Sequence, residues 1–275
     1  MTKWKYLLLW AVCAVFSPTS VAVERIITLS PHLTEWIYSL GLEDKLVGVS
    51  AFSDYPAEAS EKPVVADYQG VDFTALMALE PDLVLAWGGG NKPQDITRLK
   101  SLGIPVFISQ PDTLDAIASE ILEVARLAGA DEQSQTLVHQ YRTQLAKIQQ
   151  QYQHKPVVKV FYYMWSQPLM TIGKAAWANK FLTTCGAQSI FNDSPIDYPQ
   201  VSVKQVLLRQ PQLLVAASDQ SMQTLENFWA PHRPVIQAPL IQANVNALHR
   251  FTLRIADAIE TLCHDIDSYR QQEQK

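Results

Sequence analysis

The sequence predicts an α/β fold of two lobes with mainly parallel sheets, joined by one long α-helix. Short apolar segments alternate with amphipathic segments before residue 130 and again after residue 156, a pattern typical of βαβ units on a parallel sheet. Between them, residues 131–154 contain neither a strand pattern nor a helix breaker. Similar residues also recur at a spacing of 130, which indicates that the two lobes are related.

The first lobe is expected to begin with a strand and to alternate regularly. Gly41 and Gly103 follow two of the predicted helices and are typical helix stops. The expected elements are a strand at 25–30, a helix at 31–40, strands at 45–50 and 63–66, a helix at 73–79, a strand at 82–87, a helix at 93–102 and a strand at 104–109.

The linking helix is predicted from its apolar face. Leu137, Tyr141, Leu145, Ile148 and Tyr152 recur at helical spacing. A helix of about 24 residues is about 36 Å long, enough to run past both lobes. The predicted domains are therefore 23–130, a linking helix at 131–155 and a second lobe at 156–275.

The repeat places Tyr68 level with Tyr198 and Asp72 level with Ser202. Asp and Ser are both good N-cap residues, and each precedes a short helical segment, a proline and an apolar strand. The two tyrosines are then expected in equivalent loops of lobes that face each other.

The N-terminus predicts export. Residues 1–22 have a basic start, an apolar run too short to span a bilayer and a small-residue cleavage pattern ending at Ala22. They are interpreted as a removed secretory signal peptide of an exported protein. The alternative, a lipid anchor on Cys13, has the unsuitable neighbours Trp10 and Val12.

Charge and cysteine content agree with export. The net charge is −5, and loss of Lys3 and Lys5 with the leader makes it more acidic, which argues against a nucleic-acid partner. Cys185 and Cys263 remain in the mature chain. In an oxidising compartment an even pair predicts a disulfide, with two buried free thiols as the alternative.

Aromatic residues gather where the predicted strands end. In parallel sheets, ligands bind beyond the carboxyl ends of the strands, and rings there provide flat apolar surface with polar edges. A cleft for a large, mostly apolar ligand is therefore expected, and Gly88, Gly89 and Gly90 are interpreted as letting that ligand approach the backbone. The rings are Phe52, Tyr55, Tyr68, Trp87, Tyr163, Trp165 and Tyr198.

Catalytic and metal-binding patterns are not found. The sequence has no Gly-x-Ser-x-Gly elbow, and its six histidines show no metal-ligand spacing. A packing or capping role is expected for His32. The chain is therefore predicted to be a binding protein without a resident cofactor rather than an enzyme.

Six segments of the sequence together resemble a known family. They are ITLSPHLTEWIYSLGL, VGVSAFSDYP, LVLAWGGGN, CGAQSIF, YPQVS and LHRFTLRIADAIETLC. In order and spacing they resemble the periplasmic cobalamin-binding proteins of vitamin B12 ABC importers, within the class of binding proteins linked by one helix. The resemblance implies a monomer that holds cobalamin between its lobes and delivers it to a permease with its ATPase.

The resemblance also implies ligand contacts. Trp87 matches the family pattern directly, Phe52 stands where Tyr is typical, and Tyr68 and Tyr198 stand where Trp is typical. The polar loop before the last helix falls on Asn246, Ala247, Leu248, His249 and Arg250. Arg250 and Asn246 are expected to bond the amide groups around a corrin ring; cobalt ligation by His249 is an alternative, although cobalamin carries its own axial base.

One departure concerns docking to the permease. Thr74 and Lys204 stand where the family has a surface glutamate on each lobe. Asp72 is the nearby acidic alternative on the first lobe, and Asp193 and Asp197 are those on the second. Two other functions are possible from the sequence. The first is a haem or siderophore binder of the same architecture, in which Arg250 and Arg254 would be the basic pair in the cleft. The second is a secreted α/β hydrolase, for which the sequence shows no catalytic constellation.

Overall fold

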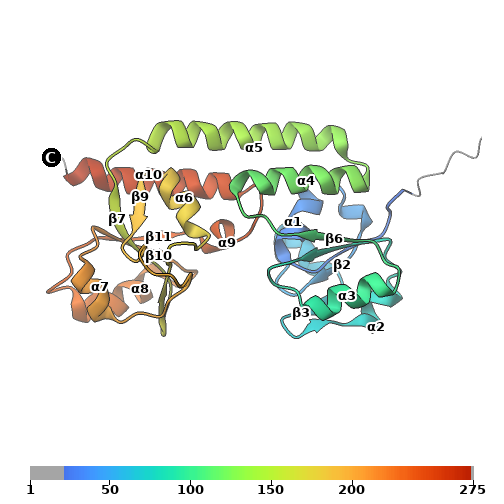
Figure 1. Ribbon diagram of the computed structural model, residues 1–275, viewed down its shortest axis with the longest axis horizontal. Helices are drawn as coiled ribbons and strands as arrows, with labels where there is room; N and C mark the ends of the chain where they lie inside the picture. Colours follow the sequence, from blue (N-terminus) through green and yellow to red (C-terminus); the bar gives the residue numbers. More distant parts are fainter. Residues whose placement is uncertain (1–21, 274–275) are drawn as a thin grey trace, which may run out of the picture.

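The computed structural model describes residues 22–273. Two α/β lobes lie side by side under one long helix, α5 (Asp131–Tyr152), which runs past both of them (Figure 1). Helix α4 (Leu114–Ala128) lies against α5 beside the first lobe, and α10 (Ile255–Glu273) lies against it beside the second. The predicted signal peptide, except for its last residue, lies outside the described residues.

The first lobe is built on a six-stranded sheet with the order β4-β3-β2-β1-β5-β6, in which only the β3–β4 pair is antiparallel. Its strands are β1 (Ile26–Thr28), β2 (Leu46–Ser50), β3 (Val64–Asp67), β4 (Gly70–Val71), β5 (Leu83–Trp87) and β6 (Val106–Ser109). Its other helices are α1 (Pro31–Ser39), α2 (Phe73–Ala78) and α3 (Pro93–Ser101), with short 3₁₀ turns η1 (Glu43–Lys45) and η2 (Ala57–Glu61).

The second lobe repeats this plan. Its parallel strands have the order β9-β7-β10-β11, equivalent to β2-β1-β5-β6, and β8 adds an antiparallel edge to β7. The strands are β7 (Val158–Ser166), β8 (Leu169–Thr171), β9 (Ala187–Ser189), β10 (Leu213–Ala217) and β11 (Leu240–Ala243). The helices are α6 (Ala178–Thr184), α7 (Val203–Arg209), α8 (Met222–Trp229), η3 (Ala230–His232) and α9 (Val245–Leu248).

The fold class is therefore confirmed, and the spacing of 130 is structural. Strands β5 and β10 begin at Leu83 and Leu213, and helices α2 and α7 begin at Phe73 and Val203. Asp72 and Ser202 cap these helices through their side chains, and Ser202 also forms a capping box with Gln205. Helix α5 begins at Asp131 as predicted and ends at Tyr152, three residues before the predicted end at 155.

The core joins the lobes into one body. The largest cluster of buried apolar residues includes Leu85 of the first sheet, Tyr141 and Ile148 of α5, and Val160 of the second sheet. Besides α5, the lobes also touch directly, because Trp36 Nε1 donates a hydrogen bond to the carbonyl of Phe251 at 2.6 Å. The sequence predicted only the linking helix.

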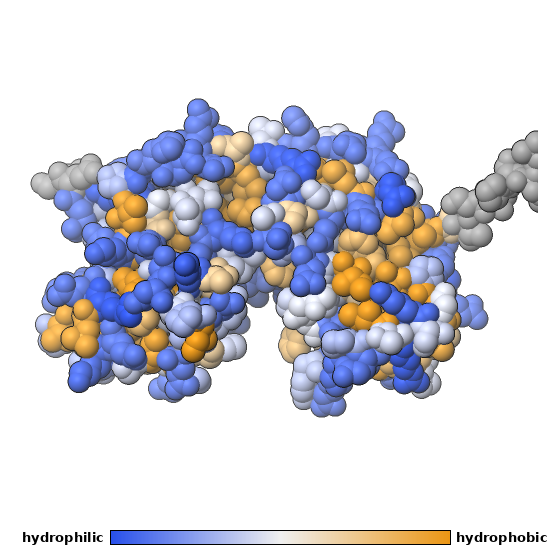
Figure 2. All heavy atoms as spheres, viewed as in Figure 1, coloured by the Kyte–Doolittle hydropathy of each residue, from blue (hydrophilic) through white to orange (hydrophobic). Residues whose placement is uncertain are grey.

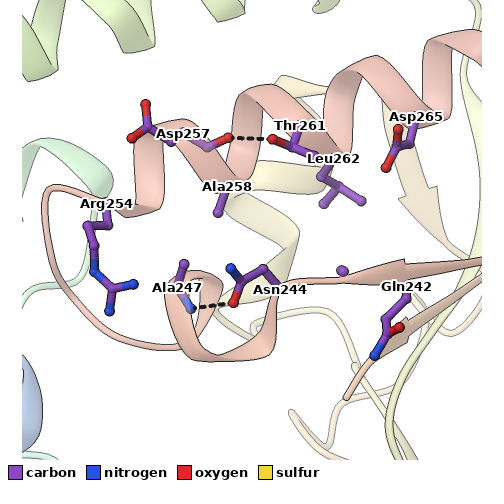
Figure 3. A pocket seen from close by; sticks show the side chains of 10 residues that line it. Gln242, Asn244, Ala247, Arg254, Asp257, Ala258, Thr261, Leu262 and Asp265 are labelled. Carbon is purple, nitrogen blue, oxygen red and sulfur yellow. Dashed lines mark hydrogen bonds between the residues drawn. The ribbon is translucent and has the colours of Figure 1, made fainter. Parts of the chain in front are cut away.

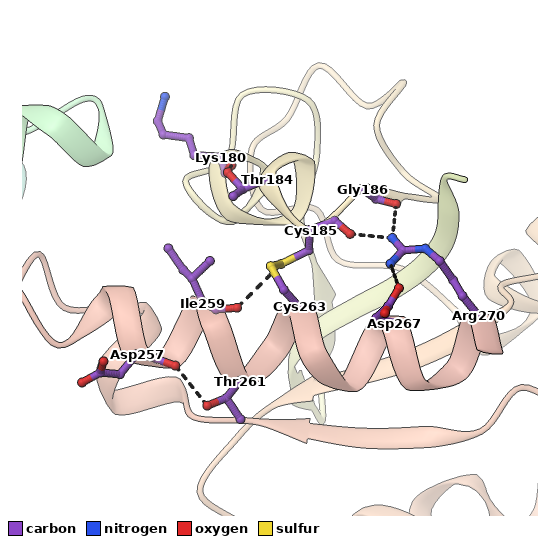
Figure 4. Close-up of a disulfide and its surroundings, with 10 residues drawn as sticks. All are labelled: Lys180, Thr184, Cys185, Gly186, Asp257, Ile259, Thr261, Cys263, Asp267 and Arg270. Carbon is purple, nitrogen blue, oxygen red and sulfur yellow. Dashed lines mark hydrogen bonds and ion pairs between the residues drawn. A yellow bond between two sulfur atoms is a disulfide. The ribbon is translucent and has the colours of Figure 1, made fainter. Parts of the chain in front are cut away.

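The predicted disulfide is present. It joins Cys185, at the end of α6, to Cys263 of α10 with an S–S distance of 1.98 Å (Figure 4). The buried guanidinium of Arg270 donates to the carbonyls of Cys185 and Gly186 and pairs with Asp267. Covalent and polar links therefore fix α10 against the rest of the second lobe.

Candidate functional site: the cleft between the lobes

The carboxyl ends of the two parallel sheets flank the place where the lobes touch. In the first lobe, Trp87 at the end of β5 and His32 after β1 lie against Phe251, with ring centroids 5.9 and 5.3 Å apart. In the second lobe, Phe251 follows α9 beyond the end of β11, and Trp177 packs edge-on against it at 4.8 Å. Figure 2 shows the lobes separated by an open cleft on the side away from α5.

Five of the predicted rings are exposed; Tyr55, at 46%, lies against the Arg254 guanidinium, and the other four have no such cationic partner among the described residues. The exposed fractions are 76% for Phe52, 83% for Tyr68, 61% for Trp165 and 41% for Tyr198. Phe52 and Tyr68 follow the carboxyl ends of β2 and β3, and Trp165 lies near the end of β7. Exposed apolar surface that gathers in one region can mark a ligand-binding groove. These four rings form the candidate aromatic wall of the cleft, defined here as Phe52, Tyr68, Trp165 and Tyr198.

Tyr163 does not belong to this wall. Its ring is fully buried, it stacks on Phe161, and its hydroxyl accepts a hydrogen bond from Trp229 Nε1 at 3.0 Å. Side chains alternate between the two faces of a strand, so Tyr163 points into the helix layer that contains α8. The prediction that it lines a cleft is wrong.

Trp87 is half-buried and accounts for the glycine turn that follows it. A Cβ atom on Gly90 would lie 2.1 Å from Trp87 Cε3, and one on Gly89 would lie 2.9 Å from Trp87 Nε1. The indole therefore lies directly over the turn. Gly89 and Gly90 make room for the Trp87 ring, whereas a Cβ on Gly88 would meet Gln110 and Ile108. That a ligand approaches the backbone at these exposed glycines stays a prediction.

The two residues after the glycines hold neighbouring loops together. Asn91 accepts a hydrogen bond from the backbone N–H of Trp87 at 2.7 Å and donates to the carbonyl of Leu29 at 2.8 Å. Lys92 Nζ donates to the carbonyl of Gln69, the residue after Tyr68. The turn thus connects the Tyr68 loop to the strand end that carries Trp87.

The loop before α10 differs from expectation. Asn246 is exposed, but Ala247 and Leu248 are buried, with 4% and 0% of their surface exposed. Their side chains pack into the main core and offer little surface to a ligand in the cleft. Only Asn246 of these three retains a polar group that is free to face an amide substituent.

His249 is also engaged within the protein. Its Nε2 shares a hydrogen bond of 2.7 Å with the hydroxyl of Tyr162. Burial lowers the pKa of His249 to about 4, so the ring is neutral at neutral pH. Cobalt ligation through Nε2 would require breaking this bond, and the structure does not support that alternative.

His32 is a buried structural histidine, as expected. Ser30 Oγ lies 2.8 Å from its Nδ1, and its ring packs edge-on against Trp36 and Trp87. Burial, followed by the charge of Arg250, lowers its pKa to about 3. Among residues 22–273, no group of three or more His, Cys, Asp and Glu side chains is placed to hold a metal ion.

Arg250 and Arg254 both pair with Glu35 of the first lobe, so that a contact of Arg250 with a ligand stays a prediction. Arg254 contacts the two carboxylate oxygens at 2.8 and 2.7 Å, and Arg250 contacts one at 3.0 Å. Arg250 also reaches Asp54 at 2.6 Å, and the Arg254 guanidinium lies 3.5 Å from the ring centre of Tyr55. We call Glu35, Asp54, Tyr55, Arg250 and Arg254 the interlobe cluster.

A family model described as periplasmic binding protein matches residues 26–228. The chain belongs to this family. This membership confirms the predictions of a periplasmic localisation and of a binding protein rather than an enzyme. No helix formed by residues 22–273 is long and apolar enough to cross a membrane.

Known proteins are similar to this chain in sequence, in fold or in both. A vitamin B12-binding protein of Vibrio campbellii is 35% identical over 271 residues, 96% of this chain and 98% of the relative. The crystal structure of the periplasmic vitamin B12-binding protein BtuF of Vibrio cholerae matches with a TM-score of 0.82 and 34% identity, over 90% of this chain and 98% of that one. A periplasmic haem-binding protein from Pseudomonas aeruginosa shares only the fold, with a TM-score of 0.75 and 20% identity over 88% and 91% of the two chains.

A second cavity lies within the second lobe of this family member. It has a volume of about 250 Å³ and opens between α9 and α10 (Figure 3). Its lining is polar or small, including Gln242, Asn244, Asp257, Thr261 and Asp265. Because no aromatic side chain lines it, this cavity lacks the flat apolar surface of the cleft.

Three of the residues considered for docking are exposed at the starts of equivalent helices. Thr74 is the second residue of α2 and Lys204 the second residue of α7. Both helices lie at the side of their lobes opposite α5 (Figure 1). The Asp72 carboxylate accepts hydrogen bonds from the backbone N–H groups of Thr74 and Ala75, so it caps its own helix.

Proposed function

We propose that this chain captures cobalamin in the cleft between its two lobes and delivers it to an ABC importer in the inner membrane. The observation that carries the proposal is the candidate aromatic wall, four exposed rings contributed by both lobes at the carboxyl ends of their sheets. The identity of 34–35% with vitamin B12-binding proteins over nearly the whole chain supports it.

The chemistry of the wall fits a corrin. A broad ring system with amide substituents needs flat apolar contact and a few uncharged polar partners, rather than a fixed counter-charge. Phe52 and Trp165 offer apolar ring faces, while the hydroxyls of Tyr68 and Tyr198 and the amide of Asn246 offer polar groups. Each well-covered ring contributes about 1–3 kcal/mol of binding through burial of apolar area.

A haem or siderophore binder is less well supported. The basic pair considered for an anionic ligand, Arg250 and Arg254, is bound to Glu35, and diverting it would leave a buried carboxylate unpaired. His32 and His249, which could serve as iron ligands, are both engaged in hydrogen bonds inside the protein.

Delivery to a permease is proposed to use the outer ends of the two lobes. Thr74 and Lys204 lie at equivalent helix starts, one on each lobe. Because neither is acidic, contacts with the permease at these positions would not be salt bridges to arginine. Co-purification of the permease with the wild-type chain, and its loss when Thr74 and Lys204 are both changed to bulky Trp, would support this contact; unchanged co-purification would contradict it.

Calorimetric titration of the mature protein with cyanocobalamin and with haemin tests the ligand. We expect one cobalamin per chain and weaker or no binding of haemin. Trp165→Ala is expected to weaken cobalamin binding by about ten- to a hundredfold. Val157→Ala is the matched control, because Val157 is 60% exposed at the opposite, amino end of the same strand. Tight haemin binding without cobalamin binding would overturn the proposal.

A further inference from the structure

The loop that carries Phe52 is held from two sides. Phe52 has a φ of +63°, in the left-handed region that residues with a side chain rarely adopt. On its own lobe, the neighbouring Ser53 hydroxyl bonds Thr34 at 3.0 Å and Ser50 at 3.3 Å. The two residues after Ser53, namely Asp54 and Tyr55, contact the second lobe instead. The strained position therefore lies between two anchored segments.

The contacts with the second lobe are made by the interlobe cluster. Arg250 Nη1 bonds Asp54 at 2.6 Å, and Arg254 stacks on the Tyr55 ring at 3.5 Å. The hydrogen bond from Arg250 lowers the pKa of Asp54 below its ordinary value, which keeps this carboxylate charged. The second lobe thus contacts Asp54 and Tyr55, the second and third residues after Phe52.

Glu35 fixes the two arginines in turn. Its side chain is only 2% exposed, and it accepts hydrogen bonds from both guanidinium groups. A carboxylate buried to this degree is strongly disfavoured without its cationic partners, and the two-pronged contact with Arg254 restricts the direction of that guanidinium. The arginines are therefore rigid supports rather than mobile surface side chains.

We propose that Arg250 and Arg254 are positioning residues, which hold the Phe52 loop of the opposite lobe so that the Phe52 ring is fixed in the cleft before a ligand arrives. This inference deepens the proposed function, because its prediction for cobalamin affinity rests on that function. A loop that samples several conformations reduces apparent affinity by the fraction that is competent, whereas a fixed loop avoids that ordering cost.

The test removes the contact between Asp54 and Arg250 and leaves the Phe52 side chain unchanged. Asp54→Ala breaks the contact with Arg250 at a side chain that is 59% exposed, and it leaves the pairs with Glu35 in place. Fluorinated phenylalanine at position 52 reports the ring by ¹⁹F NMR without ligand. We expect one sharp resonance in the wild type, and a shifted or broadened resonance in Asp54→Ala. Cobalamin affinity should fall about three- to tenfold, and Asp54→Glu should restore both readouts in part.

Asp115→Ala is the matched control, because Asp115 is also an exposed aspartate paired with an arginine, Arg142 at 2.6 and 3.1 Å, but between α4 and α5 and away from the Phe52 loop. It should leave both readouts unchanged. An unaltered ¹⁹F resonance in Asp54→Ala would overturn the inference, as would an altered resonance with unaltered cobalamin affinity. If the resonance changes and the wild type binds no cobalamin, loop positioning is supported and the proposed function fails.

Discussion

Adding one methyl group at Gly90 should displace the Trp87 ring. Its Cβ would lie 2.1 Å from Cε3 and 2.2 Å from Cζ3 of that indole, whereas carbon atoms in contact are about 3.5–4.0 Å apart. The ring must therefore move by more than about 1 Å. Because His32 and Phe251 pack against it, it cannot do so without losing those contacts, and overpacking of this kind costs about 1–3 kcal/mol.

Gly88→Ala is the control for this prediction. A Cβ on Gly88 would first meet Gln110 Oε1, at 2.7 Å, which is the end of an exposed flexible side chain. In urea unfolding, Gly90→Ala should lose about 1–3 kcal/mol and Gly88→Ala much less. Calorimetry should show about tenfold weaker cobalamin binding for Gly90→Ala alone. Equal stability and equal affinity of the two variants would refute the view that the glycines accommodate the indole.

Three further outcomes follow from the core, the disulfide and the buried histidines. Small-angle scattering should give the same radius of gyration with and without cobalamin, because one apolar cluster continues through both lobes; a large compaction would contradict this rigidity. Changing Cys185 and Cys263 together to Ser should lower the free energy of unfolding by up to about 4.5 kcal/mol in the chain-entropy model, and an unchanged stability would count against a structural role for the bond. The folded-state pKa values of His32 and His249, about 3 and about 4, lie below the ordinary imidazole pKa of 6.5. Between pH 6.5 and about pH 4, these two imidazoles are therefore protonated in the unfolded chain and neutral in the folded chain. Stability from this source is complete above pH 6.5 and should fall by about 1.4 kcal/mol per pH unit for each imidazole as the pH drops toward 4; a free energy of unfolding that stays constant between pH 7 and pH 4.5 would contradict it.

The fold could be predicted from the sequence because its signals are local. The apolar face of α5 has a helical period, and all five predicted positions contact the core: Tyr141, Ile148 and Tyr152 are buried in it, and Leu137 and Leu145 pack against it. The spacing of 130 likewise reflects two lobes with the same strand order. Such patterns depend on residues a few positions apart, or on repetition, and need no knowledge of tertiary contacts.

The site was only partly predictable because its decisive contacts are distant in the chain. Glu35 and Arg250 are 215 residues apart, and no local period relates them. The arginines were expected to be free for a ligand, and their partners Glu35 and Asp54 were not identified. One signal was available: Glu35 is an acidic residue in a helix whose neighbours Thr34 and Trp36 are fully buried, and a carboxylate in such a place requires a partner.

The reason for the glycine turn was equally hidden. The sequence shows that three glycines follow Trp87, but not that the indole folds back over Gly89 and Gly90. A side-chain rotamer decides this, and it is set by His32 and Phe251, which are far away in the sequence. The local pattern correctly marked the turn but could not show that Gly89 and Gly90 accommodate the Trp87 ring.

The most direct test of the central claim is a crystal structure of the mature protein with cyanocobalamin. The account predicts corrin density between the lobes, in contact with Phe52 from the first lobe and Trp165 from the second, with Arg250 and Arg254 still paired with Glu35. Density in the polar cavity between α9 and α10, or a cleft left empty at saturating cobalamin, would contradict it.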